Sequence, residues 1–184
     1  METKSDRFQI GKVHLEFATY DISRPSGQRQ TNHVNIYIDV AEFMNLAHFI
    51  LYGPCHSIMR ACQNGAQDIS QPLFQSLGGT SAERLAQYGR PRDDGKSLSR
   101  SVKLFAGKKE NHYLFCAESG PGETDAKGLI VPRYGTNPEQ KVSVSLSMAH
   151  LNEIMLMTLE HYRAWLSSWY AKNYNGFEVI QWQL

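Results

Sequence analysis

The feature that most constrains the fold of this chain is a ten-residue pattern that occurs twice, 108 positions apart (Val34 to Val142). Residues 34–43 (VNIYIDVAEF) align without a gap with residues 142–151 (VSVSLSMAHL). In both copies apolar and polar residues alternate with period 2, which is typical of a half-buried strand. Each strand then meets a residue that favours a helix N-terminus, Asp39 or Ser147. The repeat predicts two strand–helix units.

Both units continue into an amphipathic helix. In the second unit, apolar residues recur at helical spacing from Met148 to about Lys172, which predicts a helix of about seven turns. The first helix is shorter, because Gly53-Pro54 ends it. Glu42 follows Asp39 by three residues, and this spacing predicts a capping box at the start of the first helix.

Further strands are predicted before each unit. In the first half, residues 12–20 (KVHLEFATY) alternate, and a polar turn at 23–30 leads into the repeat. In the second half, strands are predicted at 101–106, 112–118 and 128–133. Ser119-Gly120-Pro121-Gly122 is expected to break the chain between the last two. The predicted fold class is α+β, with two antiparallel sheet-plus-helix repeats packed through their helices.

A chain of 184 residues is expected to form a single domain over 1–184. Its predicted parts are a first repeat at 7–53, an inserted helical and loop segment at 54–98, a second repeat at 99–174, and a C-terminal strand or tail at 175–184. Within the insertion, Thr80-Ser81-Ala82-Glu83 matches a capping box and predicts a short helix to about Tyr88. Residues 90–99 (RPRDDGKSLS) are rich in turn-formers and predict a loop.

Charge and cysteine content bound the class of protein. The net charge of +1 excludes a nucleic-acid binder of the strongly basic tail type and an acidic disordered chain. Three cysteines fit free thiols in a reducing compartment better than a disulfide framework. METKSDRFQ at the N-terminus has no apolar stretch typical of a secretory signal, and no segment is apolar enough to span a membrane. We therefore expect a cytoplasmic protein.

Signals for catalysis are weak. Gly89 to Ser97 ends in Gly-Lys-Ser, but five residues separate its glycines where a P-loop has four, and two of them are acidic. Cys55, His56 and Cys62 lack the short paired spacing of a zinc site, so small buried residues are the favoured interpretation. No other catalytic motif occurs. We expect a protein that is not an enzyme and that needs no metal or cofactor.

Binding signals are stronger, because positive charge is concentrated in one window. Residues 84–109 hold eight Lys and Arg against two Asp, a local charge of +6. Aromatic residues interleave with this region: Tyr88, Phe105, Tyr113, Phe115 and Tyr134. Cations that neutralise phosphates and rings that stack on bases are what single-stranded nucleic acid requires.

The alternative interpretation is that Phe105 or Phe115 is core and the lysines are a solvated hairpin. Alternation decides between the two, because Lys103 and Phe105 share one face of a strand while Val102 and Leu104 share the other. If the latter pair is buried, Phe105 is exposed beside Lys103.

The order of elements resembles the single-stranded-DNA-binding group that includes plant Whirly proteins and the transcriptional positive-cofactor-four family. The resemblance rests on residues 99–105 (SRSVKLF), the strand 112–118, the turn 119–123, Gly128-Leu129-Ile130, and the Val142 strand with its helix. It implies curved antiparallel sheets whose faces and hairpins hold nucleic acid. In the first repeat the matching face carries Lys12, His14, Glu16 and Tyr37, of which Glu16 would repel phosphate.

Together the window and the resemblance predict a protein that binds single-stranded DNA, or RNA as the second choice, with little sequence preference. The predicted contact residues are Tyr37, Arg90, Arg92, Lys96, Arg100, Lys103, Phe105, Lys108, Lys109, Tyr113, Lys127 and Arg133. The alternative is a protein-interaction or assembly module with no nucleic-acid role. The apolar helix at 148–172 would then serve a homodimer, although core packing explains most of its apolar residues.

Overall fold

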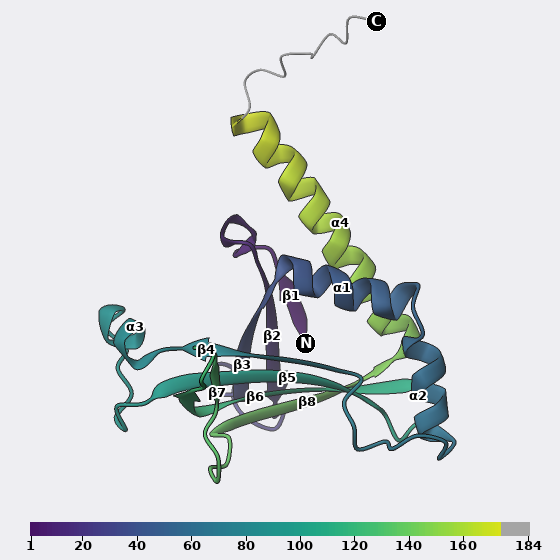
Figure 1. Cartoon of the computed structure of the whole chain (residues 1–184), viewed down its shortest axis with the longest axis horizontal. Helices are drawn as coiled ribbons and strands as arrows, with labels where there is room; N and C mark the ends of the chain where they lie inside the picture. Colours follow the sequence, from purple (N-terminus) through teal and green to yellow (C-terminus); the bar gives the residue numbers. More distant parts are fainter. Residues whose placement is uncertain (174–184) are drawn as a thin grey trace, which may run out of the picture.

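A computed structural model describes residues 1–173 as an α+β fold with two antiparallel sheets. The first sheet stands on the second, and α1 and α4 lie in the angle between them and above it (Figure 1). Phe17 of the first sheet and Phe115 of the second meet edge to face, with ring centroids 5.5 Å apart. The two sheets therefore share one hydrophobic core.

The first sheet has the order β1-β2-β3. Its strands are β1 (Glu2–Lys4), β2 (Lys12–Tyr20) and β3 (Gln30–Asp39), and a 3-10 turn at Phe8–Ile10 joins the first two. The predicted strand at 12–20 is confirmed. Apolar residues of β2 and β3 alternate into the core: Val13, Leu15, Phe17, Val34, Ile36 and Ile38.

The second sheet is built around β6, the longest strand. Its strands are β4 (Phe74–Thr80), β5 (Ser97–Ala106), β6 (His112–Thr124), β7 (Ile130–Pro132) and β8 (Gln140–Ser147). β4, β5 and β6 pair in that order, while β8 and β7 pair with different lengths of the free edge of β6. The sheet curls so that β7 also contacts β4.

Four α-helices lie within residues 1–173. They are α1 (Val40–Leu51), α2 (Cys55–Gln63), α3 (Ala82–Gln87) and α4 (Met148–Asn173). α1 contacts α4, and β3 contacts β8. The two predicted strand–helix junctions thus exist at Asp39/Val40 and Ser147/Met148, and the helices that follow them pack together.

The two helix starts differ in their capping. At α4, the Ser147 hydroxyl accepts a hydrogen bond from the backbone N–H of His150 at 3.2 Å. At α1, the Asp39 side chain makes no cap bond, because its carboxylate accepts from Lys12 Nζ at 2.7 Å. The capping box predicted at Asp39 is therefore absent.

The predicted chain break at 119–122 is wrong, since β6 runs through it to Thr124. β5 supplies a partner for this stretch, with Ser99 opposite Gly120 and Leu98 opposite Pro121. Pro121 lies between the residues that pair with β8 and those that pair with β7, so no strand there needs its missing N–H.

Residues 54–98 were expected to be helix and loop, and the structure adds a strand there. β4 pairs with β5 along its whole length, from Phe74 opposite Leu104 to Thr80 opposite Leu98. The short helix predicted after Thr80 is present as α3, capped by the Ser81 hydroxyl, which accepts from the Arg84 N–H. The strand or tail predicted at 175–184 lies outside the described residues.

Two absences apply to residues 1–173. No helix there is both long and apolar enough to cross a membrane. No group of three or more metal-ligating side chains is brought together in that range either.

Candidate nucleic-acid interface

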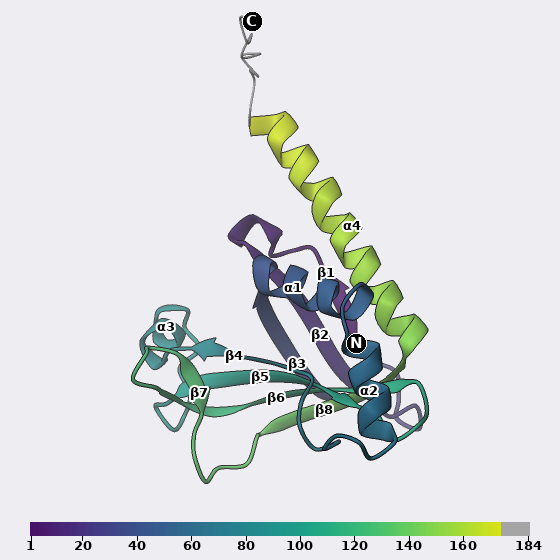
Figure 2. The ribbon, with the colours of Figure 1, turned by 45° about the vertical axis from the view of Figure 1, so that its right-hand side comes forward.

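The two sides of β5 have opposite character. Val102 and Leu104 are fully buried in the core, whereas Lys103 and Phe105 are half-buried on the other side. The alternation expected from the sequence is therefore present, and Phe105 is not a core residue. α1 and α4 lie on the core side of this sheet in both views (Figures 1 and 2).

We call the side away from those helices the outer face. The strand register places side chains of β5, β6 and β8 on it in cross-strand rows: Phe105, Leu114 and Ser145; Lys103, Cys116 and Ser143; and Ser101, Glu118 and Lys141. Phe105 lies directly opposite Leu114, which gives the ring an apolar neighbour on one side. Glu118, the acidic residue of this set, forms an ion pair with Lys141 at 2.7 Å. The outer face thus combines the half-buried Phe105 ring, small polar residues and Lys103, which forms no ion pair within residues 1–173.

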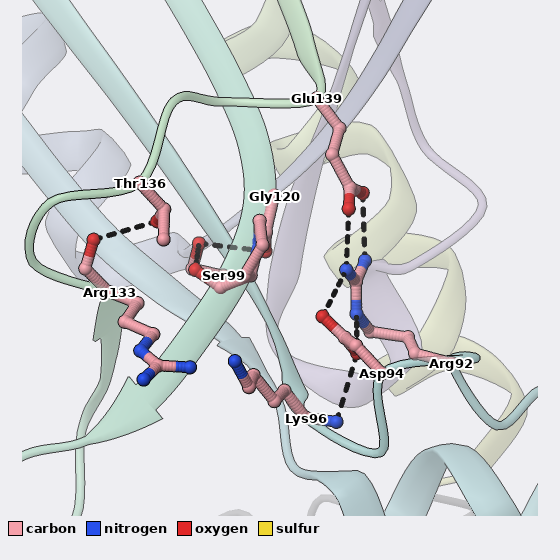
Figure 3. Close-up of polar contacts among 9 residues, drawn as sticks. Arg92, Asp94, Lys96, Ser99, Gly120, Arg133, Thr136 and Glu139 are labelled. Carbon is pink, nitrogen blue, oxygen red and sulfur yellow. Dashed lines mark hydrogen bonds and ion pairs between the residues drawn. The ribbon is translucent and has the colours of Figure 1, made fainter.

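One end of the outer face is covered by a strap, residues 133–139, which connects β7 to β8. Backbone bonds from Arg133 N to Pro121 O and from Glu139 N to Ser119 O attach it to β6. The Thr136 hydroxyl also donates to the Arg133 carbonyl at 2.8 Å. Figure 3 shows the strap beside the loop that precedes β5.

Arg92 links that loop to the strap. Its guanidinium donates to both carboxylate oxygens of Glu139, at 2.9 and 2.6 Å, and to both of Asp94, at 3.0 Å each (Figure 3). These bonds raise the pKa of Arg92 and hold the pKa of both carboxyls below their usual values. Arg92, predicted to contact phosphate, is therefore fully occupied by carboxylates and acts as a structural tie.

Lys96 and Arg133 lie beside this tie; the backbone N–H of Lys96 donates to Asp94 Oδ1 at 3.0 Å, while the side chains of both residues lie outside the tie (Figure 3). Their charged ends point toward one another across a gap at the edge of the strap (Figure 3). Within the described part of the chain, neither side chain forms an ion pair. Two converging cations of this kind suit a phosphate group.

Tyr134, an aromatic residue of the basic region, was not among the predicted contacts. Its ring follows Arg133 in the strap and is 95% exposed. An exposed ring beside a cation suits base stacking. Its position next to Arg133 is visible in the sequence. That position indicates a contact residue only once the structure shows the strap at the edge of the outer face.

The opposite end of the outer face is the turn between β5 and β6. Lys108 and Lys109 are exposed in this turn. Gln63 of α2 fixes the turn by donating through Nε2 to the carbonyls of Gly107 and Lys109, both at 2.8 Å. The structure therefore places cations at both ends of β5, separated by the length of a ten-residue strand, about 30 Å.

Tyr113 is not available for stacking, which corrects its prediction as a contact residue. Its ring is fully buried on the core side of β6, opposite Ala106. The Tyr113 hydroxyl is hydrogen-bonded to His56 Nδ1, and His56 Nε2 lies 3.1 Å from Asn152 Oδ1. Since Asn152 Oδ1 only accepts, His56 carries its proton on Nε2 and accepts the Tyr113 hydroxyl at Nδ1.

His56 of this network was one of the three residues considered for zinc. Cys55 and Cys62 are buried free thiols, and burial raises the pKa of Cys55 to about 11. Cys55 therefore stays a protonated, unreactive thiol at neutral pH. Burial also lowers the pKa of His56.

The remaining predicted contacts lie away from the outer face. Arg100 projects from the core side of β5 and its Cζ lies 5.7 Å from the centre of the Tyr37 ring, so these two form a separate site. Arg90 and Lys127 are exposed on different loops.

In the first sheet, neighbouring side chains engage the polar residues that were predicted to face nucleic acid. His14 Nδ1 lies 2.9 Å from Asp6 and its Nε2 lies 2.8 Å from Asn35 Oδ1. Glu16 forms an ion pair with Lys4.

No family model matches this chain, and neither curated proteins nor solved structures give a significant match. The geometry of the molecule is therefore the basis for assigning a function.

Proposed function

We propose that the chain binds single-stranded nucleic acid on its outer face, with little sequence preference. The observation that carries this proposal is the placement of Lys103 and Phe105 on one face of β5, with basic groups at both ends of that strand. The basic groups are the Lys96–Arg133 pair at the strap and the Lys108–Lys109 turn.

The binding energy would come from two sources. Each stacked base contributes about 1–3 kcal/mol, and Phe105 and Tyr134 are the rings placed to stack. Each phosphate neutralised by a lysine or arginine releases counterions and makes the affinity fall with salt. Neither source distinguishes one base sequence from another, because every base has a stacking face. The resemblance to Whirly proteins favours DNA over RNA as the ligand.

Fluorescence anisotropy with a labelled oligothymidylate of about 20 nucleotides tests this proposal. Phe105→Ala is expected to weaken binding by about 5- to 150-fold, the equivalent of 1–3 kcal/mol. The triple variant Lys103→Ala/Lys108→Ala/Lys109→Ala is expected to reduce the slope of log affinity against log salt by about 2, since each lost phosphate contact removes about 0.7.

Lys172→Ala provides a matched control, because this lysine is exposed near the end of α4 and away from the outer face. This variant should leave the affinity for the oligonucleotide and the slope of log affinity against log salt close to the wild-type values. Equal binding of single strand and duplex by the wild type, or unchanged binding by Phe105→Ala, would contradict the proposal.

A second function, assembly through α4, is favoured by one observation. The C-terminal part of α4 extends beyond the rest of the fold (Figures 1 and 2), and Trp169 and Tyr170 in this part are 40% and 45% exposed. Leu156 and Met157, in the first half of the same helix, are 44% and 51% exposed. Apolar side chains on a projecting helix suit a homodimer. Sedimentation velocity would detect it, and Leu156→Glu/Met157→Glu should convert a dimer to a monomer. A wild-type chain that sediments as a monomer at high concentration would exclude it.

A further inference from the structure

A pocket of about 470 Å³ lies in the corner where the first sheet meets the second. We call it the corner pocket, and its lining includes polar and charged side chains from both sheets and two helices: Lys12, Tyr37, Glu42, Thr80, Arg84 and Arg100. Tyr37 lies on the side of β3 that faces away from the core, and Arg100 lies on the core side of β5 beyond the point where the sheets separate. The volume is in the range of small-molecule sites.

Arg100 is the distinctive residue of the pocket. Its guanidinium is half-buried, donates to Thr80 Oγ1 at 3.0 Å, and lies over the ring of Tyr37. That ring is itself held by His14, which stacks on it with a centroid separation of 4.6 Å. The guanidinium is therefore fixed in place by a neutral hydroxyl and an aromatic face.

No carboxylate pairs with Arg100 among residues 1–173, although the chain pairs its other half-buried arginine, Arg92, with two. Burial accordingly lowers the pKa of Arg100, while the carboxylates raise that of Arg92. A guanidinium stays charged at all ordinary pH values. A partly buried charge without a counterion is unfavourable, so an anion that enters the pocket would be stabilised there.

The rest of the lining limits the kind of anion. Arg84 adds a second cation at an exposed position, and Lys12 is already paired with Asp39. Glu42 also lines the pocket and forms no ion pair within the described range. A ligand that carried negative charge over its whole length would be repelled by this carboxylate. A ligand with an anionic group at one end and hydroxyl or amino donors at the other could pair its anion with Arg100 and Arg84 and donate hydrogen bonds to Glu42.

We propose that the corner pocket binds a small phosphate monoester bearing hydroxyl or amino groups, such as a mononucleotide or a sugar phosphate. The phosphate lies at Arg100, where a planar guanidinium matches two phosphate oxygens, and the donors face Glu42. This site goes beyond the nucleic-acid interface, because it opens on the side of the second sheet opposite Lys103 and Phe105.

Thermal shift and isothermal titration calorimetry with adenosine 5′-monophosphate test the proposal, alongside ribose 5-phosphate, inorganic phosphate and adenosine. The two organic phosphates are expected to raise the melting temperature and to bind more tightly than inorganic phosphate, which lacks the donors. Adenosine, which lacks the anion, should bind at least about tenfold more weakly than its monophosphate.

Arg100→Gln should weaken binding of adenosine 5′-monophosphate by at least about tenfold, the effect of losing a charge-assisted hydrogen bond. Gly78→Ser supplies a second variant in case Arg100→Gln fails to fold. No atom lies within 4 Å of the position of a side-chain carbon at Gly78, so a larger residue there occupies the pocket without a clash. Lys103→Ala should leave binding of the monophosphate unchanged while it weakens oligonucleotide binding.

An oligonucleotide with and without a 5′-phosphate distinguishes the two sources of a phosphate monoester. Preference for the 5′-phosphorylated strand, lost in Arg100→Gln, would assign the pocket to strand ends; no preference would assign it to free small molecules. Absence of any shift with both organic phosphates at millimolar concentration, or equal binding by wild type and both variants, would overturn the proposal. Because the outer-face variants are read on the oligonucleotide, failure of one site is distinguishable from failure of the other.

Discussion

Substitution by alanine is expected to have opposite effects on stability at two neighbouring glycines of β4, Gly78 and Gly79. A side-chain carbon at Gly79 would lie under 3.0 Å from the backbone carbonyl of Leu98 and from two side-chain atoms of Ile130. At Gly78 the same carbon would have no neighbour within 4 Å. Gly79 therefore lets the β7 residue Ile130 sit against β4, whereas Gly78 faces the open corner pocket.

The cost of Gly79→Ala follows from which atoms it meets. Leu98 belongs to β5, which is paired with β4, so its carbonyl cannot retreat without loss of strand pairing. Overpacking of this kind costs about 1–3 kcal/mol. For a chain of this size, each kcal/mol lowers the melting temperature by about 2–4 °C, so the expected decrease is about 2–12 °C.

Gly78→Ala is the matched control, since it makes the same chemical change one residue away. Without a clash, alanine restricts the unfolded chain and should stabilise the fold by about 0.4–1 kcal/mol. Thermal unfolding followed by circular dichroism, with guanidinium unfolding as a check, measures both. If Gly79→Ala melts at or above the wild-type temperature, Ile130 does not sit where the structure places it, and the curl of the second sheet is incorrect.

Three further predictions concern the polar contacts. Tyr113→Phe leaves His56 Nδ1 without its donor and should cost about 1–3 kcal/mol in guanidinium unfolding. Arg92→Met should speed hydrogen exchange in the strap while oligonucleotide affinity changes by less than about threefold, because the guanidinium is already bound to carboxylates. Burial lowers the pKa of His56, so as the pH falls through about 6.5 this residue becomes protonated in the unfolded chain while it stays neutral in the folded chain. Stability should therefore fall as the pH drops below about 6.5, and His56→Gln should flatten this part of the pH profile.

The elements that were predictable are those whose signal is local. The alternation of β2, the strand–helix junctions at Asp39 and Ser147, and the separate faces of Lys103 and Leu104 all follow from period 2 or period 3.6. β4 was missed because FQSLGGT has neither period and carries two glycines. It forms a strand because β5 offers it a partner, which no local pattern reveals.

The candidate sites depended on long-range pairing for the same reason. Tyr113 is buried because the β5–β6 turn sets it opposite Ala106, and a shift of one residue would have placed it on the outer face. Arg100 meets Tyr37 only because two sheets from different halves of the chain come together. Arg92 was expected to contact nucleic acid, but it forms an ion pair with Glu139, which is distant in the sequence.

The two ends of β5 are chemically different, and this gives the molecule a direction. One end presents the Arg133 guanidinium and the Tyr134 ring on a tied strap, with the Lys96 ammonium beside it; the other presents Lys108 and Lys109 on a turn. A homodimer whose twofold axis crosses the binding surface would present the same contacts to a nucleic-acid strand running in either direction. The described residues of this chain form a single outer face, so a nucleic acid lying 5′ to 3′ along β5 would meet a different order of contacts from one lying 3′ to 5′.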